Sequence, residues 1–192
     1  KADKLLRVEK AKNDYAFFVE YYFPHYAKSK CGAFQIEAAN EVNKNKKLRA
    51  VFEWARGHAK STHFDIMIPL WLKAKNELNV MILVGKSEDN AGTLLADLQA
   101  ELQHNQRYIN DFGEQLNYGS WEEGKFVTKD HKAFFALGRG QSPRGLRYRS
   151  NRPDYIVVDD LDDDELVQNE NRVAKMVDWI LEALFNTMDM GR

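Results

Sequence analysis

The chain has 192 residues, of which 44% are hydrophobic and 30% charged, with a formal net charge of −1 at pH 7, values typical of a globular protein. A chain of this length can form a hydrophobic core that needs no disulfide or structural metal. Its single cysteine, Cys31, excludes an internal disulfide and fits a reducing compartment. No apolar run approaches the ~20 residues that span a bilayer and the start has no signal-peptide core, so we expect a soluble protein of a cell or host-cell cytoplasm.

Hydrophobic periodicity predicts alternating helices and strands. Helices are predicted at 2–22, 34–43, 61–75, 88–106 and 171–186, and strands at 48–54, 80–85 and 155–160. Pro24 ends the first helix, Pro69 predicts a kink in the third, and Ser87 is a predicted N-cap for the fourth. Short runs broken by glycines between Phe112 and Leu137 predict an antiparallel hairpin.

This alternation predicts an α/β fold with a mostly parallel central sheet flanked by helices. We expect one domain over 1–192, with a helical lead-in at 1–33 and a core at 34–192. Ligands of such sheets lie at the carboxyl ends of the strands, so the segments that follow the strands are the candidate sites.

The segment 51–62, VFEWARGHAKST, predicts a strand end, a tight turn and a helix start. Such a junction can hold nucleotide phosphates on loop N–H groups and the helix dipole, with Lys60 on the β/γ-phosphates and the Ser61 hydroxyl on Mg²⁺. Trp54 and Ala59 stand where the phosphate-loop pattern has glycines, and an ordinary turn with an exposed lysine is the alternative. The predicted nucleotide-binding residues here are Arg56, Gly57, His58, Ala59, Lys60, Ser61 and Thr62.

The segment 155–160, YIVVDD, predicts a buried strand that ends in carboxylates. In phosphate-loop ATPases such a strand carries the acid that holds Mg²⁺, a role that falls here to Asp159. Asp160 would then polarise the attacking water. The alternative is a strand followed by a solvated, acidic helix start.

Two further features lie outside these segments. Gln35 begins a short helix ahead of the predicted phosphate loop, where its amide could read an adenine edge or simply face solvent. The segment 138–153, GRGQSPRGLRYRSNRP, is the most basic part of the chain.

Together these pieces resemble the N-terminal ATPase domain of the large terminase subunit of tailed bacteriophages, the motor that packages DNA. The matching segments are Phe34-Gln35, ARGHAKST at 55–62, ILVGKSEDNA at 82–91, GQSPRGLRYRSNRPD at 140–154 and IVVDD at 156–160. The resemblance implies a three-layer P-loop NTPase fold of the ASCE/RecA-like type. It also implies Mg²⁺-dependent ATP hydrolysis that drives double-stranded phage DNA into procapsids.

The resemblance assigns roles residue by residue. It implies that Gln35 contacts adenine, that Lys60 binds phosphate, and that Ser61 and Asp159 bind Mg²⁺. The family usually has Glu where this chain has Asp160, so either Asp160 or Glu165 orients the water, and Asp160 is favoured.

A basic residue in 138–153 matches the arginine that such ring ATPases supply to a neighbour's nucleotide. Arg144 matches best and Arg139 is the runner-up; DNA backbone contacts or a solvated loop are the alternatives.

The resemblance also implies partners: double-stranded DNA, a homo-oligomeric ring on the portal and a small terminase subunit, with no membrane. We expect the family's C-terminal nuclease domain to be absent from this chain. A superfamily-2 helicase-like DNA translocase and a non-catalytic nucleotide- or DNA-binding module are the competing interpretations.

Overall fold

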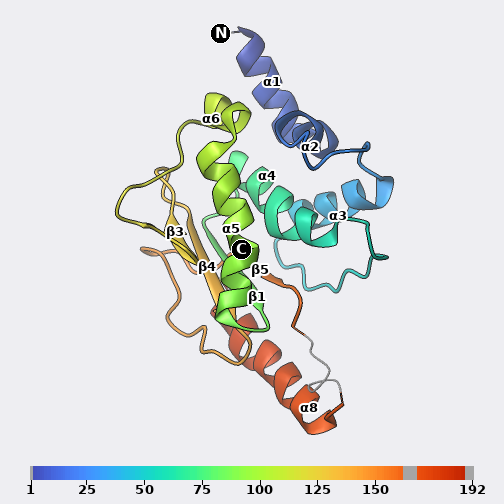
Figure 1. Cartoon of the computed structure of the whole chain (residues 1–192), viewed down its shortest axis with the longest axis vertical. Coiled ribbons are helices and arrows are strands. Elements are labelled where there is room, and N and C mark those ends of the chain that lie inside the picture. The colour runs from blue at the N-terminus through green and yellow to red at the C-terminus, as the bar shows by residue number, and fades with distance from the viewer. Residues whose placement is uncertain (1, 162–167, 189–192) are drawn as a thin grey trace.

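A five-stranded sheet forms the centre of the fold, in the order β2-β3-β4-β1-β5 (Figure 1). The computed structural model describes residues 2–161 and 168–188. The strands are β1 (Val80–Gly85), β2 (Trp121–Glu122), β3 (Lys125–Val127), β4 (Ala133–Gly138) and β5 (Tyr155–Val158). β1 pairs in parallel with β4 and β5, whereas β2, β3 and β4 pair in antiparallel. The predicted α/β fold is confirmed, but the sheet is mixed rather than mostly parallel, because the predicted hairpin continues the same sheet beyond β4.

Helices pack on both faces of this sheet. They are α1 (Ala2–Asn13), α2 (Tyr15–Tyr22), α3 (Ala33–Lys44), the π-helix η1 (Thr62–Met67), α4 (Ile68–Ala74), α5 (Glu88–His104), α6 (Gln106–Phe112), α8 (Glu170–Asp178), the π-helix η2 (Trp179–Leu184) and the 3-10 helix η3 (Phe185–Thr187). The main apolar core lies between one sheet face and helices α1 to α6, and Leu184 of η2 packs on the other face. Helix α8 buries no side chain, and it extends past one end of the sheet (Figure 1).

Strand β1 is buried along its whole length, as its unbroken apolar sequence predicts. Met81 and Leu83 face the main core, whereas Val80, Ile82 and Val84 face the smaller cluster on the opposite side. Because side chains alternate along a strand, both faces of β1 need apolar residues, and this explains the continuous run.

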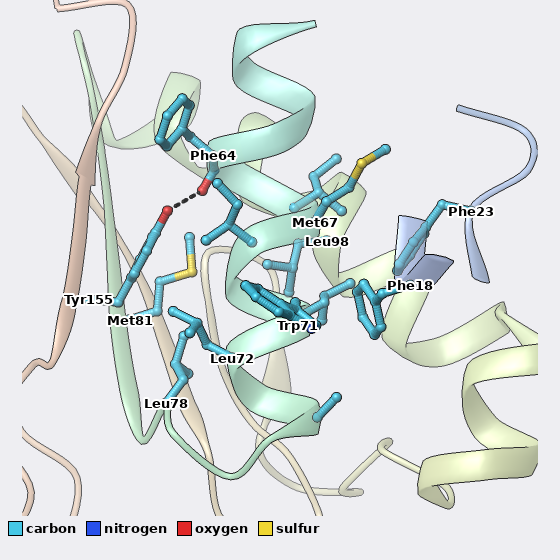
Figure 2. Packing of buried hydrophobic residues seen from close by; sticks show 14 of the residues in the cluster. Phe18, Phe23, Phe64, Met67, Trp71, Leu72, Leu78, Met81, Leu98 and Tyr155 are labelled. Atoms are coloured by element: carbon cyan, nitrogen blue, oxygen red, sulfur yellow. Dashed lines mark hydrogen bonds between the residues drawn. The ribbon is translucent and has the colours of Figure 1, made fainter. Parts of the chain in front are cut away.

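The predicted helix at 61–75 forms mostly as the π-helix η1 followed by the α-helix α4. Pro69 explains the position at which the π-helix gives way to the α-helix. In a π-helix each carbonyl accepts from the N–H five residues later, as the His63 carbonyl does from Ile68. For the Phe64 carbonyl, the residue five positions later is Pro69, which has no N–H to donate. The Tyr155 hydroxyl of β5 donates to this carbonyl instead, at 2.7 Å (Figure 2). This buried bond joins η1 to β5 and so positions the loop that precedes η1.

The predicted strand at 48–54 is wrong, because these residues form neither helix nor strand. Phe52 and Trp54 pack on Phe64 of η1, whereas Val51 before them is 87% exposed and Glu53 between them is exposed. Alternate side chains therefore produce the strand-like pattern without a hydrogen-bonded ladder. In the described part of the chain, β5 pairs only with β1 and forms an edge of the sheet.

Candidate functional site

The loop between Trp54 and η1 makes a tight, solvent-exposed turn. The N–H of His58 donates to the Ala55 carbonyl, and the N–H of His63 then donates to the Ala59 carbonyl to start η1. Gly57 has φ +87° and Ala59 has φ +58°. Ala59 therefore adopts the left-handed conformation that glycine takes easily, at the position where the phosphate-loop pattern has its second glycine.

The two residues after this loop converge on the end of β5. The Lys60 ammonium lies 3.2 Å from one carboxylate oxygen of Asp159, and the Ser61 hydroxyl donates to the other at 2.5 Å. Asp159 is 9% exposed, whereas the Lys60 side chain is 44% exposed. The structure thus brings together three of the predicted site residues, at the carboxyl end of a parallel strand.

A second buried acid, Asp65, lies against Asp159 and was not predicted. Its residue is 2% exposed, and neither of its carboxyl oxygens has a hydrogen-bond partner in the part of the chain that the structure describes. Burial, followed by the charge of Asp159, raises the pKa of the Asp65 carboxyl to about 8, although the Lys60 ammonium opposes the shift. The available signal was the presence of one acid in the otherwise apolar run FDIMIPLW at 64–71.

Asp160 follows Asp159 in a turn with φ +51°, and its side chain is exposed. The N–H of Asp159 still donates to the Val84 carbonyl, so the pairing with β1 ends just before Asp160. An exposed carboxylate beside the Asp159 position is compatible with water activation, which stays a prediction. The alternative acid, Glu165, lies outside the described residues.

Gln35 lies beside the loop, but its amide is engaged with the protein's own backbone. Its oxygen accepts from the N–H of Gly32 at 2.9 Å, and its nitrogen donates to the carbonyl of His58 at 3.0 Å. The neighbouring Phe34 ring packs against Trp54 and His58, with centroids 5.0 and 5.3 Å away. An adenine could be read by Gln35 only if it replaced one of these bonds. Of the other loop residues, Arg56 is exposed and Thr62 is half-buried.

The two candidate finger arginines differ in their surroundings. Arg139 follows β4, and its guanidinium donates to the Leu161 carbonyl at 2.9 Å, just beyond Asp160. Arg144 is exposed, and among the described residues its side chain has no hydrogen bond or ion pair. Arg139 is therefore held by its own chain, whereas Arg144 is free to reach another molecule.

A surface hollow of about 830 Å³ lies apart from the loop at 55–62, since no residue of that loop lines it. It is bordered by the start of α5, the β2–β3 hairpin and the segment 141–146. Its lining includes four exposed acids, Glu88, Asp89, Glu122 and Glu123, and only one basic residue, Lys125, so it does not resemble a phosphate site. The candidate phosphate site is the open loop itself.

The residues present fit a hydrated divalent cation. In the described ranges, no three His, Cys, Asp or Glu side chains gather as a metal site. Mg²⁺ in nucleotide sites needs only one or two protein carboxylates beside phosphates and water. The Ser61 hydroxyl, Asp159 and the unpartnered oxygens of Asp65 supply suitable oxygen ligands.

No protein-family model matches the sequence, and no curated protein is significantly similar to it. None of the helices in the described part of the chain is long and apolar enough to cross a membrane.

Proposed function

We propose that this chain is the Mg²⁺-dependent ATPase domain of a viral DNA-packaging motor of the large-terminase kind. The observation that carries the proposal is the convergence of Lys60 and Ser61 on Asp159. A lysine and a hydroxyl at a helix start, opposite a strand-end aspartate, are the elements that hold MgATP in phosphate-loop enzymes.

The present contacts fit a resting arrangement of such a site. The Lys60 ammonium and the Ser61 hydroxyl both satisfy the Asp159 carboxylate. With ATP bound, Lys60 would leave Asp159 for the β/γ-phosphates, and Ser61 and Asp159 would hold Mg²⁺, which would supply positive charge to neutralise the phosphates. The exposed loop at 55–60 leaves room for the phosphates, and its left-handed Gly57 and Ala59 let backbone N–H groups turn towards them.

Asp160 is the proposed residue that orients the attacking water, because it follows Asp159 and is open to solvent. Gln35 is the proposed adenine contact, and the exposed loop residues from Arg56 to Ala59 would surround the phosphates. These roles rest on the resemblance together with the positions of the residues.

Arg144 is the proposed finger that enters a neighbouring subunit's site, since it is exposed and unpaired among the described residues. Arg144→Ala in the assembled full-length motor should then lower ATP turnover strongly, while Arg144→Ala subunits still bind nucleotide. Unchanged turnover in that ring would remove Arg144 from the mechanism. Double-stranded DNA, the ring on a portal, a small terminase subunit and action in a host cytoplasm are parts of the same proposal.

The test of the enzymatic proposal is phosphate release from ATP, measured with Mg²⁺ and with a chelator. We expect slow, Mg²⁺-dependent release that is lost in Lys60→Ala and in Asp160→Asn. The exposed Lys28 provides a matched control, and Lys28→Ala should keep the wild-type rate. Nucleotide binding without any release would favour the non-catalytic module instead.

A further inference from the structure

We propose that Asp65 and Asp159 together form a two-carboxylate site that holds a divalent cation even before nucleotide binds. The inference rests on the proposed function for the role of Asp159, and it adds a ligand that the phosphate-loop pattern does not contain. It starts from a buried acid: Asp65 is 2% exposed, no donor among the described residues reaches its carboxyl oxygens, and its side chain lies within hydrogen-bonding reach of the Asp159 carboxylate.

A buried carboxylate without partners is costly, since burial removes its hydration. The nearest donors do not serve it. The Lys60 ammonium and the Ser61 hydroxyl are both directed to Asp159. The Lys60 ammonium therefore acts on Asp65 only as a nearby charge, and because its side chain is 44% exposed, water screens that charge.

A divalent cation matches this arrangement in charge and in ligand chemistry. In the nucleotide-free chain the cation would displace the Lys60 ammonium from Asp159, and its charge would then balance the two carboxylates. Mg²⁺ and Mn²⁺ prefer oxygen ligands, and Mg²⁺ keeps several water molecules whose hydrogen atoms can satisfy remaining carboxylate oxygens. The Ser61 hydroxyl oxygen adds a third protein ligand on the same side of η1, because Ser61 and Asp65 are four residues apart.

A proton shared between the two carboxylates is the competing arrangement, and it would need no cation. The two arrangements differ in one consequence. If a cation is the partner, the nucleotide-free chain binds it, and removing the charge of Asp65 weakens that binding. If a proton is the partner, the nucleotide-free chain has no site that depends on Asp65.

The test is a titration of the nucleotide-free chain with Mn²⁺, followed by electron paramagnetic resonance and by competition with Mg²⁺. We expect one Mn²⁺ site in the wild type, weakened about tenfold or more in both Asp65→Asn and Asp159→Asn. Asp97 is an exposed acid on α5, and Asp97→Asn is the control that should bind Mn²⁺ as the wild type does. A wild type without a Mn²⁺ site, or an unchanged affinity in Asp65→Asn, would overturn the inference.

A second variant of Asp65 and a parallel assay of nucleotide binding distinguish a failure of this inference from a failure of the proposed function. Asp65→Leu is similar in shape and matches the apolar neighbours of Asp65, so it replaces Asp65→Asn if that variant does not fold. Nucleotide binding measured in parallel separates the two proposals. Binding of MgATP with unchanged Mn²⁺ affinity in the Asp65 variants would overturn this inference alone. An Asp65-dependent Mn²⁺ site without any nucleotide binding would overturn the proposed function alone.

Discussion

The hydroxyl of Ser61 donates a 2.5 Å hydrogen bond to the carboxylate of Asp159, which lies 98 residues later in the chain. The bond joins the start of η1 to the end of β5. Tyr155 and Phe64 join the same two elements one turn of the helix further along. The orientation of Ser61 towards Asp159 is therefore set by two contacts between a helix and a strand, which is how a rigid site is maintained.

Replacing the Ser61 hydroxyl should affect the cation-dependent part of nucleotide binding. Ser61→Ala removes the proposed Mg²⁺ ligand, so we expect nucleotide affinity to fall about tenfold with Mg²⁺ and to change little without it. Ser61→Thr keeps a hydroxyl and should behave as the wild type. Titration with a fluorescent ADP derivative measures both affinities. An equal loss with and without Mg²⁺ would assign Ser61 a role in the loop alone.

The Tyr155 hydroxyl should contribute measurably to stability. Tyr155→Phe leaves the buried Phe64 carbonyl without its donor, and Pro69 cannot supply one. We expect the free energy of unfolding to fall by about 1–3 kcal/mol, as measured by urea denaturation. Tyr118 is 85% exposed, so Tyr118→Phe should change it by less than about 0.5 kcal/mol. Equal effects of the two variants would show that the Tyr155 bond is not required.

Replacing Ala59 with glycine should stabilise the protein, whereas replacing an alanine with glycine usually destabilises it. Its φ of +58° costs an L-residue roughly 1–2 kcal/mol, whereas the greater freedom of glycine in the unfolded chain costs about 0.5–1 kcal/mol. Ala59→Gly should therefore raise the free energy of unfolding by roughly 0.5–1 kcal/mol. Ala100→Gly, within α5, should lower it by about 1 kcal/mol. A loss of stability in Ala59→Gly would mean that the loop conformation is unstrained.

His63 should make stability depend on pH. Burial lowers the pKa of this imidazole from 6.5 to about 4, and its Nδ1 lies 2.7 Å from the Tyr15 hydroxyl. Between these values the unfolded chain binds the proton more strongly. The neutral His63 imidazole therefore contributes up to about 3 kcal/mol to the free energy of unfolding. This contribution is fully present above about pH 6.5 and is lost as the pH falls towards 4.

The measurement is urea denaturation at several pH values with a chelator present. His63→Gln keeps a partner for Tyr15 but does not titrate, so its stability should depend less on pH in this window. His104 is exposed, and His104→Gln should keep the wild-type dependence. Parallel curves for wild type and His63→Gln would contradict the assignment.

Local patterns predicted most of the elements. The strand predicted at 80–85 is β1, the strand predicted at 155–160 is β5 and ends earlier, at Val158, and Ser87 caps α5 through the N–H of Asn90 as predicted. The segment 2–22 forms two helices rather than one, because Asp14 interrupts it and caps α2 through the N–H of Phe17.

The errors arise where tertiary contacts decide the outcome. The pattern at 48–54 alternates because Phe52 and Trp54 pack on η1, and no sequence period distinguishes that from a strand. Lys60 and Ser61 could be predicted as the start of a helix and Asp159 as the end of a strand, although the strand expected before the loop does not form. Asp65 could not, since its importance depends on Asp159, which only the fold brings next to it.

The most direct test of the nucleotide site is calorimetric titration with a non-hydrolysable ATP analogue, with and without Mg²⁺. We expect the wild type and Lys28→Ala to bind the analogue, more tightly with Mg²⁺, and Lys60→Ala not to bind it. Equal binding by wild type and Lys60→Ala, or no binding by the wild type, would contradict the assignment of a MgATP site to Lys60, Ser61 and Asp159.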